Sequence, residues 1–416
     1  MQTIKLVYEW IGPAGPISNN NFPNLYDLRH QYDRHTDYNY PVNLPSLKHC
    51  LSDIYDMDVT PVSNIKDNDF FLYEINIDYK HYFAFDALQI SNISPRIQYI
   101  LNDDKSLGYY AFNSCLEGWC DNQFLYKLYD VLRNKKINPS KVILFTGCVN
   151  AYELHNDWVR RHRIEKPIKI IICNNFYKIP KQRINNKKSR LKKFVCFNRR
   201  WKPHRLLLYV YLHKNKLLDH FYFSLPRTNV TNGSDSFHGK VQDLVNKYAL
   251  DISADDISAA YDSLPLTLDS DDFEAGLNWW ENKKLSQYHS DSYVSIVTET
   301  MFNEPEIFPT EKTFRPMSFA QPFIALGPAG FLSGIRSLGF KTFDAIDESY
   351  DSIINDAERI KYILEIIQEM CTWPESKFEE LVTNTQVTCL HNYHLLSTTT
   401  PKSITVEHLS KLHDNR

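Results

Sequence analysis

Short apolar runs alternate with stretches of helical periodicity along most of the chain, and this alternation limits the possible folds more than any other feature. In the first half, the runs that predict strands lie at 3–9, 69–77, 107–113, 141–146 and 167–173. Helices are predicted between them, at 94–103, 122–133 and 158–163. Strands separated by helices form parallel sheets, so the predicted fold class is α/β. The run at 3–9 is expected to be an edge strand.

The pattern begins again after a basic stretch that ends at residue 193. Strands are predicted at 194–197, 221–224, 292–298, 322–326 and 341–343. Helices are predicted at 203–213, 312–319, 331–338 and 349–370. The expected organisation is two Rossmann-like domains, 1–180 and 194–372, joined by a basic linker at 181–193. A helical tail at 373–416 is free to cross back, and the two domains are expected to face each other across a cleft at the carboxyl ends of their strands.

Basic residues are concentrated in one block, although the whole chain carries a formal net charge of only −3. Residues 166–218 hold 16 lysines and arginines and no acid, whereas the rest of the chain holds 31 basic and 50 acidic residues. Such a block indicates a surface that meets phosphate, either in a nucleotide or in a nucleic acid. The alternative is a solvated basic linker.

Cysteine and glycine usage narrows the class of protein. The eight cysteines contain no CxxC pair and lie mostly in apolar runs, so reduced core residues and a cytoplasmic location are expected. No apolar run is long enough to cross a membrane. With only 12 glycines, a Gly-rich phosphate loop is excluded. Gly118, Gly147 and Gly327 follow predicted strands, where they would form turns that line the cleft.

The strongest local motif is the basic turn that follows the strand at 194–197. Asn198 ends the strand, and Arg199, Arg200 and Lys202 lead into a helix opened by Pro203, with the motif completed by His204 and Arg205. Cations are unfavourable in the first turn of a helix, and a bound anion would remove that conflict. The motif therefore predicts a diphosphate site. A basic helix start on the surface is the alternative.

A second motif opens the predicted helix at 312–319. Thr310 is a natural helix cap, Glu311 and Lys312 follow it, and Arg315 lies one turn further on. The carboxylate could accept protons from ribose or sugar hydroxyls, and the lysine could hold a phosphate. A helix cap with favourable dipole charges explains the same residues.

Glu117, which follows the strand at 107–113, is a candidate general base. An ordinary loop acid is the alternative, and Asp78 and Asp86 are rivals for the role. The histidines and cysteines show no metal-binding spacing, and there is no Walker A, GxSxG or kinase motif.

The strings Phe-Val-Cys-Phe-Asn-Arg-Arg-Trp-Lys-Pro-His-Arg (194–205) and Thr-Glu-Lys-Thr-Phe-Arg-Pro-Met-Ser-Phe-Ala-Gln-Pro-Phe-Ile (310–324) together carry a resemblance. Their pairing resembles the donor-binding half of fucosyltransferase-type GT-B glycosyltransferases. With Ser-Leu-Gly-Phe-Lys-Thr-Phe (337–343), the chain is also similar to glycosyltransferase-like proteins of tailed, T4-type phages and large viruses, over about 190–370. The spacing from Tyr293 to Glu311 is longer than in fucosyltransferases, so the sugar need not be fucose.

The resemblance implies a GT-B fold and transfer of a hexose or pentose from a UDP- or GDP-sugar to a hydroxyl group, with inversion and without a bound metal. In this interpretation 1–180 binds the acceptor, and Glu117 is the base. Domain 194–372 binds the donor. The residues that would hold the donor diphosphate are Asn198, Arg199, Arg205 and Lys312. Those that would hold the sugar or ribose are Glu311, Thr310 and Arg315.

The acceptor is open between two classes. One is 5-hydroxymethylcytosine in phage DNA, as in phage DNA glucosyl- and arabinosyltransferases, which would place the protein in the host cytoplasm. The target base would then flip into the cleft. The residues expected to neutralise the DNA backbone are Lys187, Lys188, Arg190 and Lys192. The other class is a glycan or protein acceptor. A third hypothesis, a non-catalytic phage DNA-binding protein, would leave both motifs without a role.

Overall fold

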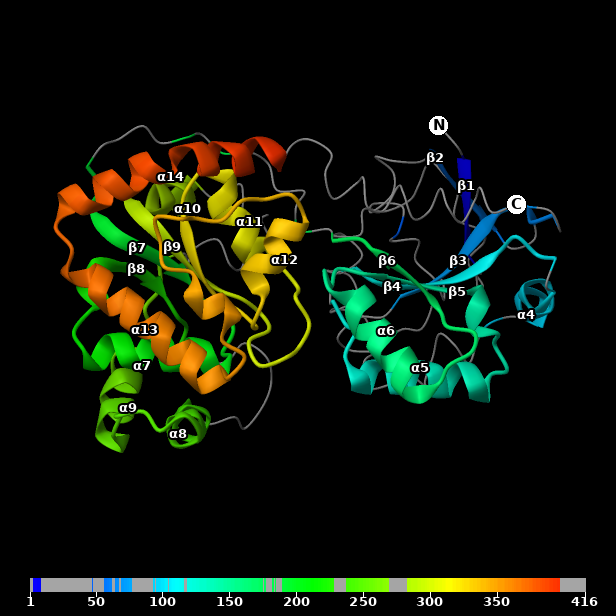
Figure 1. The fold of residues 1–416 in the computed structure, drawn as a ribbon, viewed down its shortest axis with the longest axis horizontal. Coiled ribbons are helices and arrows are strands. Elements are labelled where there is room, and N and C mark those ends of the chain that lie inside the picture. The colour runs from blue at the N-terminus through cyan, green and yellow to red at the C-terminus, as the bar shows by residue number, and fades with distance from the viewer. Residues whose placement is uncertain are drawn as a thin grey trace. The chain divides into compact units, whose positions relative to one another are not determined.

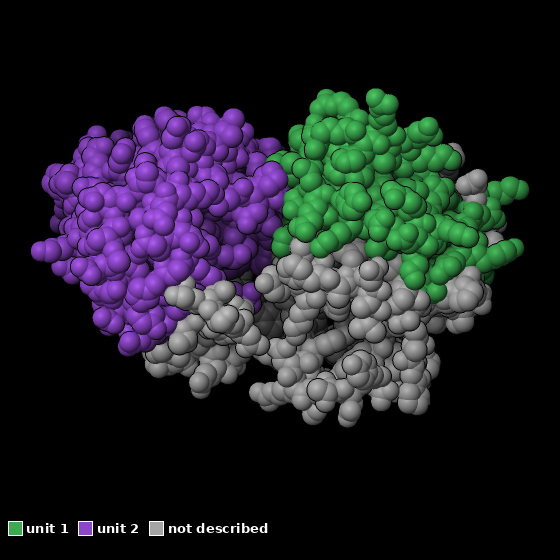
Figure 2. Space-filling model, turned by 90° about the horizontal axis from the view of Figure 1, so that it is seen from below, with its two compact units in different colours: residues 1–175, 401–416 green, residues 176–400 purple. Residues whose placement is uncertain are grey.

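The computed structural model describes residues 3–8, 47, 56–61, 64–66, 69–76, 93, 95–103, 105–115, 118–174, 176, 182, 184, 189–227, 237–268 and 283–396. The chain divides into two compact units, residues 1–175 with 401–416 and residues 176–400 (Figure 2). Each unit contains one parallel sheet with helices packed on it (Figure 1). The predicted α/β class is therefore confirmed.

The first unit contains a six-stranded sheet of order β2-β1-β3-β4-β5-β6, in which every pair is parallel. Its strands are β1 (Thr3–Tyr8), β2 (Asp56–Pro61), β3 (Phe71–Asn76), β4 (Tyr109–Ser114), β5 (Val142–Thr146) and β6 (Lys169–Ile172). Its helices are α4 (Pro95–Asn102), α5 (Asn122–Asn134) and α6 (Ala151–His162). The expectation that β1 is an edge strand is wrong, because β2 pairs on its outer side. The alternating polar residues of β2 hid it from the apolar pattern.

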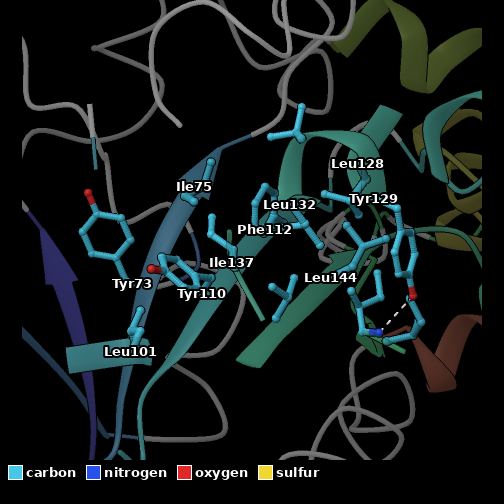
Figure 3. Close-up of a cluster of buried hydrophobic side chains, with 14 of the residues drawn as sticks. Tyr73, Ile75, Leu101, Tyr110, Phe112, Leu128, Tyr129, Leu132, Ile137 and Leu144 are labelled. Carbon is cyan, nitrogen blue, oxygen red and sulfur yellow. Dashed lines mark hydrogen bonds between the residues drawn. The ribbon is translucent and has the colours of Figure 1, made fainter. Parts of the chain in front are cut away.

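Apolar side chains cover both faces of this sheet. Figure 3 shows one cluster, in which Tyr110, Phe112 and Leu144 of the strands lie with Leu128 and Leu132 of α5. The intervening side chains of the same strands form a second buried cluster, which includes Leu72, Ala111, Ile143 and Phe145. Successive strand residues point to opposite faces, so a sheet buried on both needs nearly continuous apolar strands. The all-buried sequence of β5 meets that requirement.

The second unit contains a four-stranded parallel sheet of order β10-β9-β7-β8. Its strands are β7 (Lys192–Phe197), β8 (Phe221–Ser224), β9 (Ser292–Thr298) and β10 (Phe323–Leu326). Its helices are α7 (Pro203–Lys214), α8 (Phe237–Tyr248), α9 (Ala254–Asp262), α10 (Lys283–Ser290), α11 (Glu311–Ser318), α12 (Phe331–Ser337), α13 (Asp356–Thr372) and α14 (Glu375–Leu395). A membrane-spanning helix is absent from the part of the chain that the structure describes.

The strand predicted at 341–343 does not form. The main-chain N–H and C=O of Lys341 are bonded to the side chain of Asn392 on α14, each at 2.8 Å, and so are unavailable for strand pairing. Phe343 packs edge to face on Phe323, with ring centroids 5.2 Å apart. The segment therefore covers the sheet without joining it.

Helix α14 packs within the second unit, although the sequence pattern set 373–416 apart as a tail. Phe378 lies against Phe194 of β7 and Tyr293 of β9, with ring centroids 5.9 and 5.2 Å apart. The Tyr293 hydroxyl donates a hydrogen bond to Glu375 at 3.0 Å. Residues 397–416, on which the prediction of a segment that crosses back depends, lie outside the described residues.

The strand order puts a topological switch point between β7 and β9. The chain runs from β7 through α7 to β8 on one side, and later places β9 on the other side of β7. Parallel crossovers are right-handed, so the connections that leave β7 and β9 pass over opposite faces of the sheet. Ligands of open parallel sheets bind where such connections part, outside the carboxyl ends of the strands. The residues after Phe197 and Thr298 are therefore the place to search for a site.

Replacement of Leu144 by alanine tests the packing of the first sheet. Leu144→Ala should lower the free energy of unfolding by about 2–5 kcal/mol, because it removes buried methyl groups and leaves a cavity. Urea unfolding followed by circular dichroism measures the change. Val387→Ala, at a side chain that is 77% exposed on α14, is the control and should change it by less than about 0.5 kcal/mol. A Leu144→Ala loss as small as the control's would contradict this packing.

Candidate functional site

Asn198 joins the three strands that meet at the switch point. Its side-chain oxygen accepts a hydrogen bond from the Thr298 hydroxyl at 2.6 Å, and its main-chain N–H donates to Ser224 O at 2.9 Å. Its side-chain N–H donates to the sulfur of Cys196 at 3.2 Å. The residue is buried. Asn198 was predicted to contact a diphosphate; in the structure its side chain joins β7 to β9, and its main chain joins β7 to β8.

Arg205 fills the gap between the first turn of α7 and the end of β9. One terminal nitrogen donates to Thr298 O at 2.9 Å and Glu299 O at 3.0 Å, and the other donates to Arg200 O at 3.2 Å. Only 3% of the residue is exposed. Burial lowers the pKa of Arg205, and the Glu299 and Glu311 carboxylates oppose that shift. Its guanidinium therefore satisfies carbonyl oxygens at the end of β9 and in the turn before α7.

His204 is neutral, which changes the charge of the first turn of α7. Its Nε2 lies 2.9 Å from Glu299 O, and its ring stacks on Phe302 at 5.2 Å. A carbonyl oxygen can only accept, so Nε2 carries the proton. Burial, with the nearby positive charges of Arg205 and Lys202, holds the pKa of His204 well below its usual value. The turn therefore contains one cation where the sequence suggested two.

Lys202 is a cation that lies directly before this turn. It occupies the position before α7, is half-buried, and gives the helix no side-chain cap. Among the described residues, none accepts a hydrogen bond from its ammonium group. Burial lowers the pKa of Lys202; Glu304 opposes this shift. The positive charges of Arg205, Lys312 and Arg200 lower it further, so several cations converge here.

The start of α11 contributes one of these cations, Lys312. Thr310 caps the helix, and its hydroxyl accepts a hydrogen bond from the Lys312 ammonium group at 3.1 Å. That ammonium group also donates to Glu311 at 2.8 Å. Burial alone would raise the pKa of Glu311, but the Lys312 ammonium group outweighs it and lowers the pKa to about 2. Glu311 is therefore ionised at physiological pH and can accept hydrogen bonds but not donate one.

The remaining arginines of the two motifs, Arg199, Arg200 and Arg315, differ in exposure and in contacts. Arg199 and Arg200 are exposed in the turn between β7 and α7. Arg315 lies with its guanidinium carbon 5.5 Å from the ring centroid of Phe197, and its charge adds to the lowering of the pKa of Glu311. All three belong to connections that leave the carboxyl edge of the second sheet.

Glu299, which the sequence analysis did not single out, is central to the same edge. Its carboxylate accepts hydrogen bonds from Thr310 N at 3.0 Å, the Thr310 hydroxyl at 2.7 Å, the Thr313 hydroxyl at 2.5 Å and Thr300 N at 3.1 Å. Only 1% of the residue is exposed. An acid directly after an apolar strand was the signal that singled out Glu117, and the same signal was present here.

The turns at glycine have unequal roles. Gly147 and Gly327 directly follow β5 and β10, and Gly118 adopts a positive φ of 64° four residues after β4. Beyond Gly327, the carboxylate of Asp351 accepts the N–H groups of Leu332 and Ser333 at the start of α12, at 2.7 and 3.0 Å. A carboxylate of the chain itself thus takes the place that an anion would have at α12.

Two of the residues expected to bind a DNA backbone lie at the amino end of β7, at the other edge of the sheet from Lys202. The Arg190 guanidinium donates to Ser292 O at 2.6 Å and stacks over the Tyr293 ring at 5.5 Å. The Lys192 ammonium group donates to the carbonyl oxygen of Asp219 at 2.5 Å. Both side chains fasten the start of β7 to its neighbours.

The other expected site residues lie outside the described residues: Glu117, its rivals Asp78 and Asp86, and the two lysines Lys187 and Lys188. Four residues before Glu117 in the sequence, the Asn113 side-chain oxygen accepts a hydrogen bond from Cys115 N at 3.1 Å, and its side-chain N–H donates to the buried Glu74 at 2.8 Å. Within the described segments, no three His, Cys, Asp or Glu residues gather in a way that could hold a metal ion.

No protein-family model matches the chain, and no curated protein matches it. Among solved structures, the chain is similar to a UDP-forming trehalose-phosphate synthase from Burkholderia xenovorans, at 9% identity and a TM-score of 0.46, covering 84% of this chain and 75% of that one. The corresponding synthase from Burkholderia vietnamiensis gives 10% identity, a TM-score of 0.43, and coverage of 85% and 74%. TarM from S. aureus gives 14% identity, a TM-score of 0.34, and coverage of 81% and 57%. Because the identities are low and the TM-scores lie below 0.5, these likenesses support no conclusion about function, which has to be argued from the residues of this chain.

Removal of the Arg205 side chain should destabilise the second unit. Arg205→Ala would remove the guanidinium that donates to Thr298 O and would leave Glu299 O with His204 as its remaining donor, so we expect a loss on the order of 3 kcal/mol in the free energy of unfolding. Urea unfolding followed by circular dichroism measures it. Arg336→Ala, at a guanidinium that is 46% exposed, is the control and should cost less than about 1 kcal/mol. Equal stability of Arg205→Ala and the native protein would contradict the assigned role.

The depressed pKa of Glu311 predicts a pH dependence of stability. Because the folded pKa of about 2 lies below the ordinary 4.5, the contribution of this carboxylate is complete above about pH 4.5 and is lost as the pH falls towards 2. Glu311→Gln removes it at every pH. The difference in free energy of unfolding between the native protein and the variant should be constant from pH 8 to 5 and shrink between pH 4.5 and 3. A difference that grows on acidification would show that the pKa is raised.

Proposed function

We propose that the chain is a glycosyltransferase that moves a sugar from a nucleotide-diphosphate sugar to a hydroxyl group. One observation carries the proposal. At the switch point of the second sheet, the half-buried ammonium group of Lys202 has no hydrogen-bond acceptor among the described residues and lies in the field of other cations, one of which, Lys312, bonds the ionised Glu311. A diphosphate supplies the missing negative charge, and sugar or ribose hydroxyls supply protons for the carboxylate to accept.

The proposed roles at the donor site follow from where the cations lie. Lys202 and the exposed Arg199 and Arg200 face the diphosphate from the start of α7, and Lys312 faces it from the start of α11. Positive charges fixed at this place stabilise the negative charge that builds up on the departing nucleotide diphosphate. Glu311 binds hydroxyls of the sugar or ribose.

Arg205, Asn198 and Thr310 support the site from behind, because their side chains bind the carboxyl edge and the start of α11. Arg315 lies over the Phe197 ring, and its positive charge helps to lower the pKa of Glu311 and so keeps that carboxylate ionised. These four residues act mainly through the groups that touch the donor.

The transfer itself needs a base. In our proposal Glu117 takes the proton of the acceptor hydroxyl, whose oxygen attacks the anomeric carbon of the donor sugar. The bond between that carbon and the diphosphate oxygen breaks, and its electron pair leaves with the nucleotide diphosphate. A single displacement of this kind inverts the anomeric configuration. The transferred group is a hexose or a pentose.

We propose 5-hydroxymethylcytosine in DNA as the acceptor, with a glycan or protein hydroxyl as the competing class. The support is the resemblance of segments 194–205, 310–324 and 337–343 to glycosyltransferase-like proteins of tailed phages. Arg190 and Lys192 add nothing to it, because they bind main-chain carbonyls at the amino edge of the second sheet.

A nucleotide-sugar panel tests the donor and the acceptor together. The full chain is incubated with UDP- and GDP-sugars and with hydroxymethylated duplex DNA, followed by mass spectrometry of the released nucleosides. A mass increase of one hexose or pentose on hydroxymethylcytosine is the expected result. Donor hydrolysis without modified nucleosides would point to a glycan or protein acceptor. Absence of both donor binding and donor hydrolysis across the panel would overturn the glycosyltransferase proposal.

Removal of the Lys202 charge should weaken donor binding. Lys202→Met keeps the apolar stem but loses a charge-assisted hydrogen bond to phosphate worth about 1.5–3 kcal/mol, or roughly a 10- to 100-fold rise in the donor Kd. Isothermal titration calorimetry with the preferred nucleotide sugar measures it. Lys341→Met, at an exposed lysine beyond α12, is the matched control and should leave the Kd unchanged. Equal affinities of the two variants would remove Lys202 from the site.

A further inference from the structure

We propose that Glu299 is a positioning residue that sets the place of Lys312 and Glu311 at the start of α11, and thereby the affinity for the donor. The consequence for the donor rests on the function proposed above. Glu299 lies directly after β9, between the strand and the connection that leads to α11. It is buried, with 1% of the residue exposed to solvent.

The carboxylate of Glu299 holds the first turn of α11 through both of its oxygens. Oε1 accepts from Thr310 N at 3.0 Å and from the Thr313 hydroxyl at 2.5 Å, while Oε2 accepts from the Thr310 hydroxyl at 2.7 Å and from Thr300 N at 3.1 Å. A carboxylate that accepts four hydrogen bonds fixes its partners in distance and direction. Lys312 then bonds to the same Thr310 hydroxyl at 3.1 Å, so its ammonium group takes its position from this arrangement.

The main chain of the same residue holds α7. Glu299 O accepts hydrogen bonds from Arg205 at 3.0 Å and from His204 at 2.9 Å, both in the first turn of that helix. Lys202 directly precedes this turn. Lys202 and Lys312, the two lysines proposed to hold the diphosphate, belong to different connections of the sheet. Glu299 contacts the helix start next to each of them, through its main chain at α7 and through its carboxylate at α11.

Asp351 provides an internal comparison. It is also a buried carboxylate that accepts main-chain N–H groups at a helix start of the second sheet, from Leu332 and Ser333 of α12. Its helix start carries no lysine of the proposed site. Loss of either carboxylate removes buried hydrogen bonds, but only the loss of Glu299 should move the donor-binding lysine.

The test compares Glu299→Gln with Asp351→Asn in the full-length protein. Glutamine retains one accepting oxygen, so it cannot satisfy all four donors that face Glu299. Hydrogen exchange of the donor-free protein, read by mass spectrometry, should speed up at the start of α11 in Glu299→Gln and at the start of α12 in Asp351→Asn. Calorimetry with the preferred UDP- or GDP-sugar should show at least a tenfold rise in Kd for Glu299→Gln and less than a twofold change for Asp351→Asn.

A second variant covers the case in which Glu299→Gln does not fold. Thr313→Val nearly keeps the shape of the side chain but removes one of the four donors to Glu299, and should give smaller changes in the same directions. Unchanged Kd and unchanged exchange at α11 in a folded variant at either residue would overturn the proposal. An equal rise in Kd for Asp351→Asn would also overturn it, because general loss of stability would then explain both.

Failure of the proposed function gives a different pattern. If the native protein binds no nucleotide sugar, the donor role of the site is wrong, and with it the effect of Glu299 on donor affinity. The exchange rates of the donor-free protein still decide whether Glu299 holds the start of α11. Faster exchange at α11 without any donor binding would therefore reject the function while retaining the structural link.

Discussion

The second unit depends on how the carbonyl oxygens at the end of β9 are satisfied. Thr298 is the last residue of β9 and Glu299 follows it, and their buried carbonyl oxygens would be costly to leave unpaired. Arg205 and His204 donate to them from the first turn of α7. This contact fixes α7 against β9. The carboxylate of Glu299 extends the same support to α11, so two helix starts become one rigid edge.

These contacts explain why Lys202, and not Arg205 or His204, is the group before or in the first turn of α7 that we propose for anion binding. Both terminal nitrogens of Arg205 donate to carbonyl oxygens and His204 is neutral, whereas the ammonium group of Lys202 makes no hydrogen bond to the described residues and can bind an anion directly. At α12 the equivalent place is taken by the carboxylate of Asp351. Of these helix starts, α7 alone pairs a missing side-chain cap with an unbonded lysine among the described residues.

Sequence patterns gave the position of this edge but not the state of its residues. The strands at 221–224 and 292–298 and the motifs at Asn198 and Thr310 were predicted where the structure has them, because apolar runs and helix caps are local signals. The neutrality of His204 and the burial of Arg205 depend on contacts with residues about 95 positions away. Long-range contacts of this kind leave no local pattern.

The basic block of the sequence divides in space according to what each cation touches. Lys193 donates to the carbonyl oxygens of Cys371 and Trp373 at 2.5 and 2.8 Å, at the end of α13, where a positive charge also suits the helix dipole. Arg190 holds the start of β9 in a comparable way. Lys202, in the same block, has no such carbonyl among the described residues. Charge density along the sequence therefore does not distinguish the cations that are bonded to main-chain carbonyls from Lys202, to which we assign a role in the proposed donor site.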